Sequence, residues 1–143
     1  MKTRRALATT CLLLASLTSY GQAFAHGSAE HGKMKMDVPM QKLHAMMPFF
    51  SLASAQLETA LEKGDALAAG TEAAKILAAI PDLKLAKPHK NVKQRKKFLA
   101  LAANLDQSVT ATNDLAKQGD FARAKVAFKR VEETCAACHA KFR

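Results

Sequence analysis

Residues 121–142, FARAKVAFKRVEETCAACHAKF, carry the most regular apolar pattern in the chain. Every third or fourth residue is apolar or a cysteine, namely Phe121, Ala124, Phe128, Val131, Cys135, Cys138 and Phe142. Alternating steps of three and four residues place these side chains along one face of an α-helix. The segment therefore predicts an amphipathic helix that buries this face, both cysteines included, against other helices.

Three further segments have the same helical spacing: residues 37–63, 65–81 and 92–117. Pro48 lies inside the first segment and is expected to kink or split it, and Pro81 is expected to stop the second. The expected core face of the second segment is Leu67, Ala74, Leu77 and Ile80. No run of alternating β-branched residues predicts a strand.

Two similar turns connect these segments in pairs. Gly64-Asp65 joins the first two segments, and Gly119-Asp120 joins the last two. Glycine can adopt the left-handed conformation that ends a helix, and aspartate can cap the next one. Short turns make antiparallel neighbours, so the sequence predicts an all-α, antiparallel four-helix bundle of two helical hairpins over residues 37–143.

The final segment contains a CxxCH motif, Cys135-Ala136-Ala137-Cys138-His139. Two thiols three residues apart lie on one side of a helix, where each can form a thioether to a haem vinyl group. The next residue then offers an imidazole to the iron. A redox-active pair is expected at a helix start beside a sheet, and structural zinc needs four ligands. The motif predicts one covalent haem c near the C-terminus, with a plain disulfide in a haem-free helical interaction module as the alternative.

The ending CAACHAKFR, in which two residues and an aromatic-Arg pair follow CxxCH, resembles the class II c-type cytochromes. This four-helix family contains cytochromes c′ and c556, and the resemblance is closest over residues 118–143. It implies that Cys135 and Cys138 carry the thioethers, that His139 is the proximal iron ligand and that Arg143 lies near the haem. It also implies a homodimer through the first two helices.

The resemblance makes the sixth iron ligand depend on the first helix. A methionine there gives a low-spin electron carrier, whereas an apolar residue leaves the iron open to NO or CO. Here the segment at 40–50 reads MQKLHAMMPFF, without the arginine of the Arg-Gln pair that the family often carries.

Counting from the two turns places residues 44–49 of the first helix at the level of the haem. Met46 lies on the apolar face of this helix and Met47 is one residue off it, so Met46 or Met47 is the expected sixth ligand. His44 is the alternative, although it lies on the opposite side of an unbroken helix. A distal Phe49 or Phe50 with no protein ligand is the third reading.

The chain is basic, with 22 Lys and Arg against 12 Asp and Glu and a formal net charge of +10. Seven basic residues lie between 84 and 97: Lys84, Lys87, Lys90, Lys93, Arg95, Lys96 and Lys97. Aromatic residues are not interleaved with them, which argues against nucleic-acid binding. Two readings stay open, a solvated helix start and a docking surface for an acidic redox protein, built from Lys90, Lys93, Arg95, Lys96 and Lys97. His89 in the same stretch is expected to be exposed.

The first 25 residues have the layout of a secretory signal peptide. A basic start is followed by an apolar run at 6–17 and by Ala23-Phe24-Ala25, after which cleavage is expected. The run is too short to span a bilayer. We expect the mature protein to lie in the periplasm. The His- and Met-containing residues 26–36 are expected to form a flexible tail, with copper binding as the alternative.

The sequence thus predicts a periplasmic monohaem c-type cytochrome that carries one electron between acidic redox proteins and is not an enzyme. The alternative is a c′-like protein that binds NO or CO at an open distal site.

Overall fold

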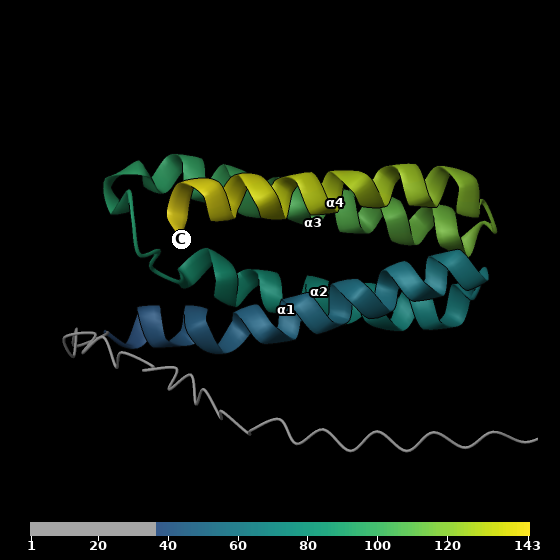
Figure 1. The fold of residues 1–143 in the computed structure, drawn as a ribbon, viewed down its shortest axis with the longest axis horizontal. Helices are drawn as coiled ribbons and strands as arrows, with labels where there is room; N and C mark the ends of the chain where they lie inside the picture. The colour runs from purple at the N-terminus through teal and green to yellow at the C-terminus, as the bar shows by residue number, and fades with distance from the viewer. Residues whose placement is uncertain (1–36) are drawn as a thin grey trace, which may run out of the picture. The chain divides into compact units, whose positions relative to one another are not determined.

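The computed structural model describes residues 37–143 of this protein, and the predicted signal peptide and tail lie outside them. Four α-helices form an antiparallel bundle, as predicted: α1 (Val38–Lys63), α2 (Ala66–Leu85), α3 (Arg95–Lys117) and α4 (Phe121–Phe142). In Figure 1 the α1–α2 hairpin lies alongside the α3–α4 hairpin. Residues 37–143 contain no strand. None of these helices combines enough length with enough hydrophobicity to cross a membrane.

The predicted turns are built as the sequence indicates. Gly64 and Gly119 adopt left-handed conformations, with φ of 69° and 75°. Asp65 and Asp120 each accept a hydrogen bond from a backbone N–H three residues ahead, at 2.9 Å from Ala68 and 3.0 Å from Arg123. Asp37 caps α1 in the same way, at 3.1 Å from the N–H of Met40. α1, α2 and α4 therefore each begin with a backbone donor satisfied by a carboxylate, whereas α3 has no side-chain cap.

Neither proline ends a helix. α1 continues through Pro48 as one helix from Val38 to Lys63, and the prediction that Pro81 stops α2 is wrong, because α2 runs on to Leu85. The added turn buries Leu83, which compensates for the backbone hydrogen bond that a proline lacks. The guanidinium of Arg95 also donates to the carbonyl oxygens of Lys84 and Ala86, which satisfies acceptors at the end of α2.

The core face of α2 also differs from the predicted one. Ile80 is buried and Leu77 packs against the core, as predicted, but Leu67 is 83% exposed and Ala74 is exposed. The other buried apolar residues of α2 are Ala69, Ala73, Ile76 and Leu83. Small alanines at the contact allow α2 to pack closely against its neighbours, so the face is decided by fit rather than by the largest side chain. The apolar face predicted for α4 packs in the core or against it.

Candidate functional site

A cavity of about 780 Å³ lies between α1 and α4, near the end of the bundle that holds the start of α1 and the end of α4. Its lining is mainly apolar and includes Leu83 from α2 and Phe98 and Leu105 from α3. This size and lining are typical of sites that enclose a small molecule or cofactor.

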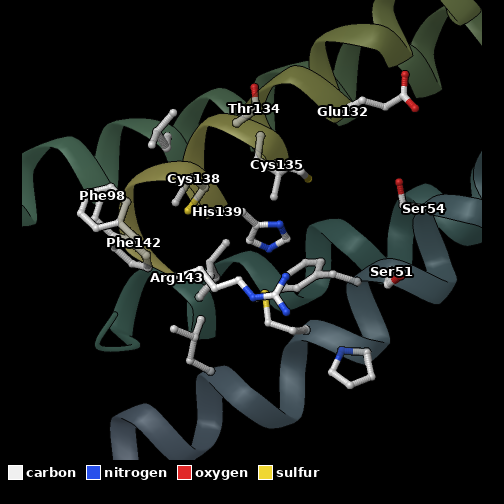
Figure 2. A pocket seen from close by; sticks show the side chains of 18 of the residues that line it. Ser51, Ser54, Phe98, Glu132, Thr134, Cys135, Cys138, His139, Phe142 and Arg143 are labelled. Carbon is white, nitrogen blue, oxygen red and sulfur yellow. The ribbon is translucent and has the colours of Figure 1, made fainter. Parts of the chain in front are cut away.

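The CxxCH motif lines one wall of this cavity. Cys135 and Cys138 are half-buried free thiols one helical turn apart on α4, and His139 lies beside them. Figure 2 shows the His139 imidazole extending from α4 into the space between α4 and α1. The i, i+3 and i+4 positions of an α-helix share one side, which brings the three groups to the same cavity.

Burial sets the protonation of the two thiols. Desolvation raises the pKa of Cys135 above its ordinary value, and the nearby Glu132 carboxylate raises it further. Desolvation also raises the pKa of Cys138, with Cys135 as the second cause. Both effects favour the protonated thiol over the thiolate, which is the reactive form of cysteine.

The opposite wall of the cavity comes from α1. His44, Met47, Ser51, Ser54 and Glu58 are among its lining residues, and their spacing of three and four residues defines one helical face. This cavity face is adjacent to the core face that contains Met46 and Phe50. His44 was expected on the side of α1 opposite the apolar face, and it lines the cavity all the same, because the cavity meets a different side of α1 than the core does.

The candidate sixth ligands differ in whether they line this cavity. Met46 and Met47 both pack against the core, but Met47 and His44 line the cavity and Met46 does not. Phe50 also lines the cavity. Phe49 is 41% exposed and reaches the site only through an edge-to-face contact with Phe50, at 6.0 Å between ring centroids.

Two further residues line the end of the cavity, and only one of them was expected there. Arg143 lines the cavity, where the resemblance places it. His89 is exposed as expected, but it also lines the cavity and contacts His44, with ring centroids 4.5 Å apart and planes at 89°. Sequence reasoning missed this role, because no local pattern links residue 89 to residue 44.

The basic stretch is only partly free. Lys84 pairs with Asp106 at 3.1 Å, and Lys87 pairs with Asp37. Arg95 is committed to carbonyl groups and lies over the Phe98 ring at 5.4 Å. Within this basic stretch, residues 84–97, the exposed basic residues that make no ion pair are Lys90, Lys93, Lys96 and Lys97.

The residues present fit a covalently bound haem. Two thiols, an imidazole and an apolar cavity lie together, and each is what such a cofactor needs: attachment points, an iron ligand and a dry pocket. The described residues contain no cluster of three or more His, Cys, Asp or Glu that could hold a bare metal ion.

Comparison with known families supports the same interpretation. The stretch from residue 86 to residue 143 matches the family model described as Cytochrome C'. Residues 86–143 are therefore similar to the cytochrome c′ family. The matched region covers the loop after α2, all of α3 and the α4 wall of the cavity. No curated protein and no solved structure matches the chain.

The cytochrome c′ match confirms the class of protein that the ending CAACHAKFR resembles. It indicates a haem protein that carries electrons or binds small gas molecules, in a family whose members are typically not enzymes. The α1 wall, with Met47 and His44, lies before the matched region, so the distal side rests on the geometry of the cavity alone.

Proposed function

We propose that this protein is an exported, periplasmic cytochrome with one covalent haem c, which carries single electrons between redox proteins. The observation that carries the proposal is the placement of Cys135, Cys138 and His139 on one wall of an apolar cavity. Bound there, haem supplies an iron that changes oxidation state by one electron. The chain contributes two thioether attachment points, the His139 ligand and a cavity that excludes water.

Mass spectrometry of protein produced together with a haem-attachment system tests this proposal. One covalent haem per chain is expected, and none in the Cys135→Ala/Cys138→Ala variant. A wild-type chain without haem and with a Cys135–Cys138 disulfide would instead support the haem-free helical interaction module.

For the sixth ligand we propose Met47. Both methionines are partly buried against the core, but only Met47 is among the residues that line the cavity. A thioether and an imidazole on opposite sides of the iron favour a low-spin electron carrier. His44 is the alternative ligand, because it shares the cavity face of α1.

Optical spectra of three variants distinguish these ligands. Met47→Ala is expected to convert the iron to a high-spin form that binds CO, whereas Met46→Ala, the matched control, keeps the wild-type spectrum. Loss of the low-spin spectrum in His44→Gln, with Met47→Ala unchanged, would assign the ligand to His44.

The second candidate function is capture of NO or CO. Phe50 lines the cavity beside Met47, and an iron facing that ring would be open to a gas molecule. Prompt CO binding by the reduced wild-type protein, together with a high-spin ferric spectrum, would favour this function over electron transfer.

The partner we propose is an acidic redox protein that docks at Lys90, Lys93, Lys96 and Lys97. All four are exposed and lie at the start of α3 or just before it, where positive charge opposes the helix dipole. Arg95 from the predicted patch serves internal contacts instead. If the patch steers the partner, electron-transfer rates fall as the salt concentration rises.

A homodimer through α1 and α2 is also part of the proposal. Leu52 on α1 and Leu67 on α2 are 60% and 83% exposed, so both helices present apolar side chains to a second copy. Sedimentation velocity of the haem-loaded protein tests it, and a monomer at all concentrations would contradict it.

A further inference from the structure

Charged and polar side chains are separated along the length of the cavity. Glu58 of α1 and Glu132 of α4 line the part nearer the two turns, while Arg143 lines the part at the end of α4. Glu132 and Arg143 are eleven residues apart on one helix, about 16 Å along its axis. Figure 2 shows Glu132 beyond Cys135, toward the start of α4, and the Arg143 side chain beside the His139 imidazole.

The loop between α2 and α3 brings a second donor to the Arg143 end. The backbone N–H groups of His89 and Lys90 both donate to the carbonyl oxygen of Phe142, each at 3.2 Å. The side-chain amide of Asn91 donates to the carbonyl oxygen of Lys141 at 2.7 Å. These bonds hold His89 next to the last turn of α4.

The ring of His89 is also supported from α1. His44 contacts it edge-to-face at 4.5 Å between centroids, and Lys87, two residues earlier in the loop, pairs with Asp37 at the start of α1. The loop is therefore fixed to both walls of the cavity. These contacts give the exposed His89 imidazole a defined position at the end of the cavity.

We propose that His89 and Arg143 receive the propionate carboxylates of the porphyrin, which places the carboxylate edge of the macrocycle at this end of the cavity. The inference rests on the proposed function, since it concerns the same haem. A guanidinium carries five N–H donors in a geometry that matches a carboxylate, and an imidazole provides at least one more. Glu58 and Glu132 disfavour the opposite orientation, because like charges in a partly buried site repel.

Resonance Raman spectroscopy of the haem-loaded protein tests the assignment, because the propionate bending band responds to hydrogen bonds at the carboxylates. The band is expected to shift in His89→Leu and in Arg143→Gln. His89→Gln, which restores an N–H donor, is expected to return it toward the wild-type position. Lys93→Gln removes a nearby positive charge that does not line the cavity, and it is expected to leave the band unchanged.

Mass spectrometry of each variant separates the two proposals. A wild-type band position in both His89→Leu and Arg143→Gln, with one haem attached, would overturn the assignment and leave the cytochrome proposal standing. A shift of the propionate bending band in Glu132→Gln alone would place the propionates at the other end of the cavity, which would also overturn the assignment. A wild-type chain that takes up no haem would overturn both.

Discussion

Asp120 connects a single side chain to the stability of the hairpin between α3 and α4. The backbone N–H of Arg123 donates to one carboxylate oxygen at 3.0 Å, and the Arg123 guanidinium pairs with the other. These two contacts hold the pKa of Asp120 below its ordinary value of 3.8. The folded state therefore favours the charged carboxylate of Asp120, and this carboxylate stabilises the fold when it is ionised.

We expect this contribution to depend on pH with a definite sign. Because the folded-state pKa is lowered, the stabilisation is complete above pH 3.8 and is lost as the pH falls through the folded-state value. Asp120→Asn keeps a capping group without the charge, so it should be less stable than wild type at neutral pH. Thermal unfolding followed by circular dichroism should show this gap narrowing on acidification to about pH 3.

Asp114→Asn is the matched control for this prediction, since Asp114 is exposed on α3 and caps no helix. A gap between wild type and Asp120→Asn that stays constant with pH would contradict the prediction.

Two glycines are expected to respond to alanine with opposite signs. Gly119 has φ of 75° with open space around it, so Gly119→Ala should cost about 1 kcal/mol from backbone strain alone. Gly70 lies inside α2, and an added methyl would meet only the Asn113 side-chain oxygen at an ordinary 3.6 Å. Gly70→Ala should therefore stabilise the fold by about 0.5–1 kcal/mol.

Chemical denaturation of the two variants measures both free energies of unfolding. Equal signs would show that the left-handed turn is not the constraint that we assign to it.

At the scale of elements, α1 has two functional faces, one packed in the core and one lining the cavity. Leu57 and Ala60 belong to its buried core face, while Met47 and Ser51 face the cavity beside α4. The sequence predicted the helix and its core face. It did not predict the cavity face, because polar and apolar residues alternate there and only the position of α4 defines it.

At the start of α3, the same positive charges are expected to destabilise the helix and to attract an acidic partner. Lys96 and Lys97 are exposed near the helix N-terminus, where cations are unfavourable and no acidic residue lies in the first turn. Lys96→Glu/Lys97→Glu should stabilise the fold by on the order of 1 kcal/mol. It should also slow electron exchange with an acidic partner at low salt, measured by stopped-flow spectroscopy.

Lys125→Glu/Lys129→Glu provides the control, because it makes the same change in net charge on exposed positions of α4. If both double variants slow the exchange equally, the effect comes from net charge and not from the patch.

At the scale of the whole molecule, the cavity is the part of the bundle that the chain alone does not fill. Cys135 and Cys138 are only half-buried although they lie on the core face of α4, because a cavity of about 780 Å³ adjoins them. A gap of this size loses the packing contacts that a close-packed core would make.

We therefore expect haem attachment to stabilise the fold strongly. The Cys135→Ala/Cys138→Ala variant should melt at least about 10 °C below the haem-loaded protein, since about 1 kcal/mol corresponds to roughly 4 °C or more in a domain of this size. It should also bind a dye for exposed apolar surface. Ala137→Ser, an exposed change within the motif, should leave the melting temperature near that of wild type. Equal melting temperatures with and without haem would contradict the prediction.

The sequence by itself determined the helices, the turns and the attachment motif. Local interactions carry these features: Asp120 caps the helix that follows it, Gly119 adopts the conformation that few other residues tolerate, and the spacing of Cys135 and Cys138 places both thiols on one helical face. Each depends on residues within about four positions of one another.

Only the tertiary structure decided what surrounds the motif. α2 continues past Pro81 because Leu83 is buried and because Arg95 donates to a carbonyl oxygen at the end of the helix. Met47 rather than Met46 lines the cavity because α4 packs beside that face of α1. His44 and His89 meet although forty-five residues separate them. These outcomes depend on contacts between segments far apart in the chain, whose free energy no local pattern contains.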